Sequence, residues 1–173
     1  MILPAVRERL ESLLRQPSVE GALAELRANA GLVSITGLHD VAKALVAVYL
    51  THALRRPAFF VTDSNRRAES LAETLRFFAG IFPGASGNVG TLPSFDRLPW
   101  EMQSPHADIL ERRATTLFRL VDGQISLVIA PMAAALWRYQ DPAAYLYLTK
   151  TLAKDTEIGH EELITHLDRK SVV

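Results

Sequence analysis

With 173 residues, of which 49% are hydrophobic and 22% charged, the chain has the composition of an ordinary globular protein and can bury a sizeable core. Its basic and acidic residues balance at 19 each, so net charge does not favour binding to nucleic acid or to a membrane. The absence of cysteine excludes disulfides and thiolate metal sites. The start, MILPAVRERLESLL, turns charged by Arg7, which is not typical of a signal peptide, and no apolar run is long enough to span a membrane comfortably, so we expect a cytoplasmic location.

Two amphipathic helices are expected at the N-terminus. The stretch AVRERLESLLR places its apolar residues on one stripe, namely Val6, Leu10, Leu13 and Leu14. The stretch SVEGALAELRANAG begins at Ser18, a favoured N-cap residue, and ends at Gly31, which is typical of the position after a helix.

From residue 32 onward, predicted strands alternate with predicted helices. The strands are expected over LVSI (32–35), AFFVT (58–62), a short stretch around 89–92, and ISLVIA (125–130). The helices are expected over 39–55, 64–79, 106–121 with Ser104 as cap and Pro105 at its first position, and from Pro131 onward. The last strand is a continuous apolar run, which is typical of a strand buried on both faces of a parallel sheet.

This alternation predicts an α/β fold with a doubly wound, mostly parallel sheet built from right-handed βαβ units. Near 138–146 the pattern changes, because RYQDPAAY is turn-like and LYLTKTLA alternates like a strand of another sheet. A helix is predicted after it, over GHEELITHL. We therefore expect N-terminal helices over 1–30, the α/β domain over 31–140, and the start of a second, small α+β domain over 141–173, which is too short to be stable alone.

The stretch ITGLHDVAKAL nearly fits the phosphate-binding loop G-x-x-x-x-G-K-[ST] of nucleotide-binding proteins. Gly37 and Lys43 are in place, but Ala42 replaces the second glycine and Ala44 replaces the hydroxyl residue that binds Mg²⁺. Asp40 adds a negative charge inside the loop, where it would repel a phosphate. The stretch therefore predicts a strand–turn–helix connection that has lost the chemistry of a nucleotide site.

Nothing else in the sequence supplies catalytic or metal-binding chemistry. The strand over 125–130 ends without a carboxylate to hold a metal, and Asp63 with Ser64 is interpreted as the cap of the following helix. No Ser lies in a G-x-S-x-G motif. The histidines lack metal-binding spacing; they are His39, His52, His106, His160 and His166. We expect no catalytic residue, no cofactor and no metal in this chain.

Three other groups of residues have a functional and a structural interpretation, and the structural one is favoured for each. An acid/base pair could be imagined among Glu101, Asp108 and Glu111, but acidic residues in a first helical turn interact with the helix dipole. Base stacking could be imagined for Phe95, Arg97 and Trp100, but aromatic residues in a Pro-rich loop more often anchor it to the sheet. Solvated helix faces are expected at the arginine pairs Arg55–Arg56, Arg66–Arg67 and Arg112–Arg113.

The stretch TLPSFDRLPWEMQSPHADILERRATTLFRL (91–120) resembles a segment of the bacterial transcription-repair coupling factors, the Mfd family. Members carry a short strand, an aromatic residue, an LPY/W turn, and SPH-x-DI leading into a helix with Arg and TL-x-RL. Three neighbouring stretches are also similar to family segments in the same order: GLHDVAKAL, AFFVTDSNRRAESLAETLRFF and LVIAPMAAAL. The resemblance covers roughly residues 18–167.

The resemblance implies both a fold and a role. The N-terminal module of that family is related to UvrB and keeps the P-loop NTPase fold of the RecA and UvrB domain 1a type without its ATPase motifs. Its inserted second domain docks UvrA, and the full-length protein displaces stalled RNA polymerase by ATP-driven DNA translocation and recruits UvrA for nucleotide excision repair. ATP, Mg²⁺, RNA polymerase and DNA bind parts far downstream of this segment. No UvrA-contacting residue is transferred, because the family's contact arginines belong to a part of the second domain that this chain lacks, and the tail DRKSVV matches no family pattern.

Three functions remain open at this point. The first is a non-catalytic, UvrB-like recruitment module of a transcription-repair coupling factor. The second is a fragment of a UvrB-type or helicase-like NTPase that still binds ATP through Lys43, and the third is a free-standing α/β protein-interaction domain. The incomplete second domain is expected to expose strand edges and so to favour self-association.

Overall fold

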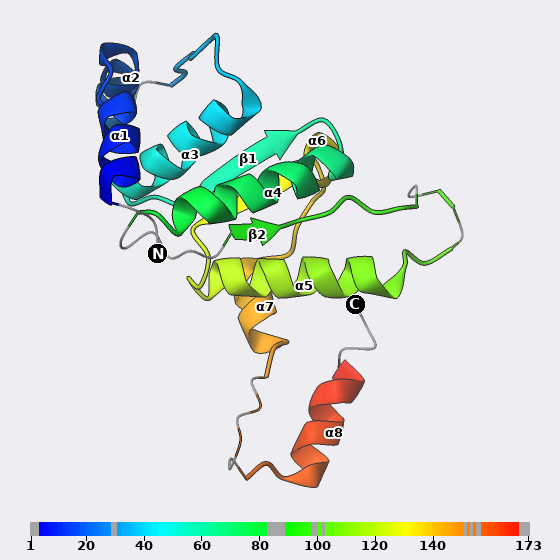
Figure 1. The fold of residues 1–173 in the computed structure, drawn as a ribbon. Helices are drawn as coiled ribbons and strands as arrows, with labels where there is room; N and C mark the ends of the chain where they lie inside the picture. Colours follow the sequence, from blue (N-terminus) through cyan, green and yellow to red (C-terminus); the bar gives the residue numbers. More distant parts are fainter. Residues whose placement is uncertain are drawn as a thin grey trace. The chain divides into compact units, whose positions relative to one another are not determined.

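The computed structural model describes residues 4–28, 31–82, 89–97, 100–101, 103–150, 152, 154 and 157–169 (Figure 1). The chain divides into two compact units, Met1–Trp137 and Arg138–Val173, and each is described by itself. The boundary expected from the sequence, at residue 141, lies slightly further along the chain. Residues 1–30 belong to the first unit, where Leu14 and Val19 join its core.

Within the described residues the first unit holds a three-stranded sheet and the helices around it. The strands are β1 (Ala58–Thr62), β2 (Val89–Thr91) and β3 (Leu127–Pro131). The helices are α1 (Pro4–Leu14), α2 (Pro17–Arg27), α3 (Asp40–Leu54), α4 (Asn65–Ala79), α5 (Ala107–Val121) and the short α6 (Met132–Ala135). Every helix of the described chain is too short or too polar to cross a membrane.

The strands form a parallel sheet in the order β1-β3-β2. Leu127 of β3 is in register with Ala58 of β1 on one side and with Val89 of β2 on the other. Because β3 lies in the middle, all five of its residues are buried, as its continuous apolar run predicts. The mixed α/β class with a parallel sheet is confirmed.

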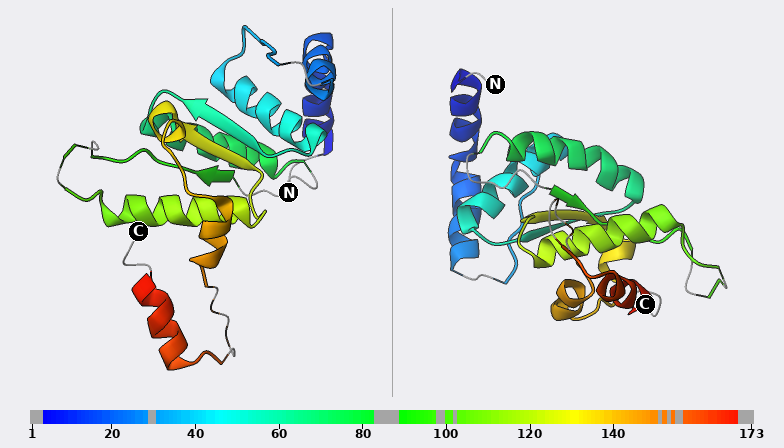
Figure 2. Two further views of the ribbon diagram at one scale, coloured as in Figure 1. Left: turned by 180° about the vertical axis from the view of Figure 1, so that it is seen from behind. Right: turned by 90° about the horizontal axis from the view of Figure 1, so that it is seen from below.

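The main core lies between one face of this sheet and the pair α3 and α4. Ile129 of β3 and Val89 of β2 contribute to it from the sheet, and Leu75 of α4 is fully buried there. Gly90 follows Val89 and therefore faces the other side, where it lies under Thr116 of α5. Helices consequently cover both faces of β2, with α4 on one and α5 on the other (Figure 2).

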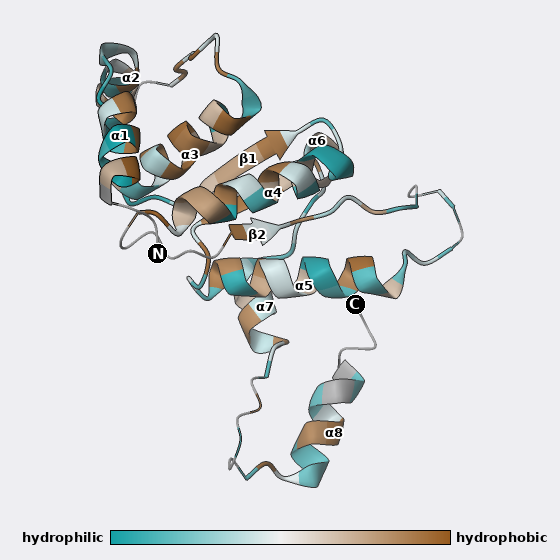
Figure 3. Ribbon diagram, viewed as in Figure 1, coloured by the Kyte–Doolittle hydropathy of each residue, from teal (hydrophilic) through white to brown (hydrophobic). Residues whose placement is uncertain are grey.

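Strand β1 lies at one edge of the sheet and is the least covered of the three strands. Apolar residues are concentrated along β1 and α3 (Figure 3). Phe60 packs against the main core, whereas Phe59 and Val61 are 44% and 41% exposed. Successive residues of a strand point to opposite faces, so β1 has one covered face and one largely open face.

Residues 32–35 do not form the predicted fourth strand. The side chain of Ile35 packs against the core, Val33 is half-buried, and Leu32 is 91% exposed. The prediction was wrong because an apolar alternation specifies which side chains are buried, whereas a strand also needs a neighbouring strand for its backbone groups. The segment instead leads irregularly from the N-terminal helices to α3.

The helix ends agree only partly with the sequence. Ser64 caps α4, as predicted, because its Oγ accepts a hydrogen bond from a backbone N–H of the first turn at 3.3 Å. The cap of α5 is His106 rather than Ser104, and its Nδ1 accepts such a bond at 3.4 Å. Helix α2 begins at Pro17, before the expected cap Ser18, because proline is well suited to the first position of a helix.

The described part of the second unit is helical, with α7 (Pro142–Tyr147) and α8 (His160–Arg169). Helix α8 confirms the prediction over GHEELITHL. Residues 138–141 are irregular, in agreement with the turn-like RYQDPAAY (138–145), but the chain then forms α7, which Asp141 caps by accepting a bond from the Ala143 N–H at 2.8 Å. The strand predicted over LYLTKTLA (146–153) is wrong at its described residues. Between Arg138 and Arg169 the described residues contain no strand, so the expected α+β character is not found there.

Candidate functional site

The candidate site lies at the carboxyl edge of the sheet, where β1 ends and two helices begin. Strand β1 ends at Thr62 and α4 begins at Asn65, directly after it. Asp40 starts α3, and Arg67 of α4 reaches its side chain, so the beginning of α3 lies at the same edge. In open α/β sheets, ligands bind in the crevice outside the carboxyl ends of the strands.

The degenerate phosphate loop forms the turn and helix start that its sequence predicts. Gly37 has a φ of 77°, a left-handed conformation that glycine adopts easily, and α3 begins three residues later. Ala42, Lys43 and Ala44 therefore lie in the first turns of the helix. Ala44 is fully buried in the main core, so this position offers a methyl group to the core and no ligand to a metal ion.

Lys43 does not extend freely into the loop. Its Nζ lies 3.2 Å from Oδ1 of Asp40, one helical turn earlier. Arg67 of α4 donates from Nη2 to both oxygens of the same carboxylate, at 2.8 Å to Oδ1 and 2.9 Å to Oδ2. Two cationic side chains from different helices therefore converge on Asp40.

Asp63 holds the other side of Arg67. Arg67 Nη1 donates to Asp63 Oδ2 at 3.0 Å, and the Ser64 hydroxyl donates to Asp63 Oδ1 at 2.8 Å. The predicted capping role thus belongs to Ser64, while Asp63 forms an ion pair with Arg67. In the described part of the chain, no three His, Asp or Glu side chains gather in a way that could hold a metal ion.

The pairing shifts the pKa values of the charged groups in the direction that keeps them ionised. Hydrogen bonds from Arg67, and then from Lys43, lower the pKa of Asp40. The Ser64 hydroxyl and Arg67 lower the pKa of Asp63, and the two carboxylates raise the pKa of Arg67. The side chains remain roughly half exposed, so solvent screens these interactions and each pair adds little to stability.

Next to this ion-pair network is a cavity of about 560 Å³. Its polar wall consists of Asp40, Lys43, Asp63 and Arg67, and the remaining lining is Phe60, Val61, Thr62, Leu71 and Met132. The two carboxylates balance the two cations, and both carboxylates are ionised at neutral pH.

The aromatic loop after β2 is anchored as predicted at one of its two aromatic residues. The guanidinium of Arg113 is buried and lies 4.0 Å from the ring centre of Phe95, and Trp137 packs edge-on against the same ring. Arg113 also donates to the Pro93 carbonyl at 2.6 Å. Trp100, in contrast, is 76% exposed and does not pack onto the sheet.

Of the three acidic residues considered as an acid/base group, Asp108 alone lies in the first turn of α5, as the helix-dipole interpretation requires, so that interpretation is wrong for Glu111. Asp108 lies in the first turn of α5, where its carboxylate is 3.7 Å from His106 Nδ1. Glu111 follows one turn later, and both residues are exposed. Neither residue lines the cavity at the carboxyl edge.

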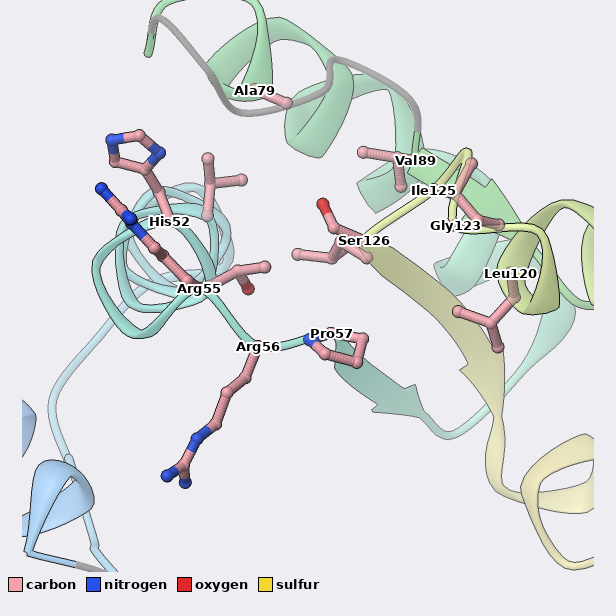
Figure 4. A pocket seen from close by; sticks show the side chains of 13 residues that line it. His52, Arg55, Arg56, Pro57, Ala79, Val89, Leu120, Gly123, Ile125 and Ser126 are labelled. Atoms are coloured by element: carbon pink, nitrogen blue, oxygen red, sulfur yellow. The ribbon is translucent and has the colours of Figure 1, made fainter.

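A second cavity, also of about 560 Å³, was not predicted from the sequence and lies at the opposite, amino edge of the sheet (Figure 4). Basic side chains from the end of α3, including His52 and Arg55, stand on one side, and Ser126 before β3 stands on the facing side (Figure 4). The arginine pair here was interpreted as a solvated face. Because helix C-termini carry partial negative charge, basic residues at the end of α3 are also suited to stabilise that helix.

No protein-family model, curated protein or solved structure matches the chain.

Proposed function

We propose that the chain is a non-catalytic recruitment module, which keeps the architecture of a P-loop NTPase domain but has no working nucleotide site. We further propose that it is the UvrB-like N-terminal part of a transcription-repair coupling factor. One observation carries the non-catalytic part of the proposal: Lys43, the cation of the degenerate loop, is paired with Asp40, which Arg67 also binds.

The chemistry of a phosphate loop explains why this observation matters. Such a loop needs a lysine that reaches the phosphates, a hydroxyl that binds Mg²⁺, and backbone N–H groups that curl around the ligand. Here a carboxylate lies beside the lysine, and the buried methyl of Ala44 takes the place of the hydroxyl. A nucleotide would meet a negative charge and would lack a metal ligand at the same place.

The proposed partner is UvrA, and the support for it is the ordered resemblance of residues 18–167 to the coupling-factor family. In this proposal the second domain, beginning near residue 141, provides the docking surface. The full-length protein would bind ATP, Mg²⁺, DNA and RNA polymerase through other parts. The first unit would serve as a scaffold that presents the docking domain.

The non-catalytic part of the proposal is tested by titrating the purified chain with a fluorescent ATP analogue in the presence of Mg²⁺. We expect no saturable binding by the wild-type chain or by the Lys43→Ala variant. Micromolar binding that disappears in Lys43→Ala would overturn the proposal and would favour a nucleotide-binding NTPase fragment.

The recruitment part is tested with the natural protein that carries this chain, at its full length, and purified UvrA. Surface plasmon resonance should detect a complex whose affinity is the same for the wild-type protein and for Lys43→Ala, because the loop takes no part in docking. Failure to bind UvrA would contradict this part and would leave a free-standing interaction domain as the better interpretation.

A further inference from the structure

The arrangement around Asp40 resembles an occupied anion site. Two cations from different helices, Lys43 and Arg67, approach the same carboxylate from two directions. The carboxylate itself lies at the first residue of α3, where the partial positive charge of the helix N-terminus adds to theirs. A guanidinium that donates to two oxygens of one group suits carboxylates and phosphates equally well.

We propose that Lys43 and Arg67 form a clamp for a phosphate group, and that the chain's own Asp40 carboxylate occupies this clamp. The proposal deepens the proposed function, on which it rests, because it names what keeps the degenerate loop closed to phosphorylated ligands. The ligand class is a compact polyphosphate, and inorganic pyrophosphate is the simplest member.

Asp63, the other partner of Arg67, can keep its contact when Asp40 is removed. Asp63 accepts from Nη1, whereas Asp40 accepts from Nη2, so removing Asp40 frees one donor nitrogen while Asp63 still orients the guanidinium. Ser64 in turn holds Asp63. The net charge of the two cations and two carboxylates is zero with Asp40 present and +1 without it.

The surroundings provide room for the ligand. The clamp residues line the cavity of about 560 Å³, which Val61 and Met132 also line. Pockets of this size hold small molecules, so a diphosphate fits without rearrangement of the sheet. In the wild-type chain, pyrophosphate has to displace an attached carboxylate, which competes at a high effective concentration.

The test is isothermal titration calorimetry with pyrophosphate, without metal ions, on the wild-type chain and on Asp40→Ala. We expect pyrophosphate to bind at least about tenfold more tightly to Asp40→Ala, since the variant loses both the competing carboxylate and its charge. The double variant Asp40→Ala with Arg67→Ala should lose this gain, because the clamp then lacks its guanidinium.

Asp63→Asn is the matched control. It removes the same unit of negative charge from the same network but leaves Asp40 in the clamp, so its affinity should stay within about threefold of the wild type. Asp40→Asn, which keeps the shape of the side chain, provides the same comparison if Asp40→Ala does not fold.

Several outcomes would overturn the clamp. The first is that pyrophosphate binds the wild type and both Asp40 variants with equal affinity. The second is that Asp63→Asn gains as much affinity as the Asp40 variants, and the third is that the gain persists when Arg67 is also replaced. Failure of the proposed function is distinguishable, because it appears as Lys43-dependent binding of the ATP analogue by the wild-type chain. A missing gain in the Asp40 variants contradicts only the clamp.

Discussion

Arg67 binds both carboxylate oxygens of Asp40, at 2.8 and 2.9 Å, although the two residues are 27 positions apart in the sequence. The contact joins the start of α4 to the start of α3 across the carboxyl edge of the sheet. It places the Asp40 carboxylate between Arg67 and Lys43, the lysine of the degenerate phosphate loop. The same contact therefore supports a non-catalytic function and suggests how the loop is kept closed.

Replacing Arg67 by Met should raise the pKa of Asp40 towards its ordinary value of 3.8, because the first cause of the lowered value is lost. A carboxyl whose pKa is lower in the folded state stabilises the fold above the unfolded-state pKa, and this contribution disappears as the pH falls through the folded-state value. The stability difference between wild type and Arg67→Met should thus be present at neutral pH and shrink in acid below 3.8. Carboxyl ¹³C NMR titration measures the pKa of Asp40, and urea unfolding at neutral pH and below pH 3.8 measures the stability difference. An unchanged Asp40 pKa in Arg67→Met would contradict Arg67 as the main cause of the lowered value.

The neighbouring arginines Arg112 and Arg113 should respond very differently to substitution by Met. Arg113 is buried against Phe95 and donates to a backbone carbonyl, so its loss should cost about 2–3 kcal/mol of unfolding free energy. Arg112 makes a half-exposed pair with Glu69, so its loss should cost at most about 0.5 kcal/mol. Urea denaturation of both variants provides the comparison, and similar losses would mean that the buried contacts contribute little.

Substitution of Gly90 by Ala should be destabilising because no room exists for a Cβ. The added atom would lie 2.5 Å from Ile125 Cδ1 and 2.9 Å from Thr116 Cγ2, and Thr116 is held by its hydrogen bond to the Thr91 carbonyl. Overpacking of this kind costs about 1–3 kcal/mol. Gly80→Ala is the control, since its nearest neighbours lie at 3.5 Å or more and its φ of −71° suits alanine. Chemical denaturation should show a loss for Gly90→Ala alone.

Arg55→Gly should stabilise the chain. Arg55 ends α3 with a φ of 52°, in the left-handed region that favours glycine, and a residue with a Cβ in this region costs on the order of 1 kcal/mol. The gain should be about 0.5–1 kcal/mol in thermal or urea unfolding, whereas Arg56→Gly, at a position without positive φ, should bring no gain. Loss of stability in Arg55→Gly would show that the arginine side chain makes a favourable contact that exceeds the strain.

Local patterns predicted most of the secondary structure of the first unit. The apolar run that includes Leu127 and Ile129 predicted the central strand, and the helical spacing of the apolar residues along 64–79 predicted α4 together with its Ser64 cap. These features depend on residues close in sequence, so the pattern contains the needed information. The absence of a metal ligand at position 44 could be predicted for the same reason, because the side chain of alanine has no group that binds a metal ion.

The failures occurred where local pattern and tertiary contact disagree. LVSI has the apolar character of a strand, but the described chain brings no strand beside it. In α1 the predicted stripe is buried only at Leu14, while Val6 and Leu13 are 44% and 54% exposed, because only part of that face meets another element. Near Asp141 a helix cap, rather than an apolar alternation, determined the local structure.

By itself, the sequence determined the α/β class, the central buried strand, and the absence of a glycine at position 42 and of a hydroxyl at position 44, since each follows from residue types at short spacing. Only the tertiary structure decided the strand order β1-β3-β2, the burial of Arg113 and the pairing of Lys43 with an Asp40 that is also bound by Arg67. These depend on contacts between residues far apart in the chain. No local pattern specifies which distant charged side chain will lie within hydrogen-bonding distance once the core has formed.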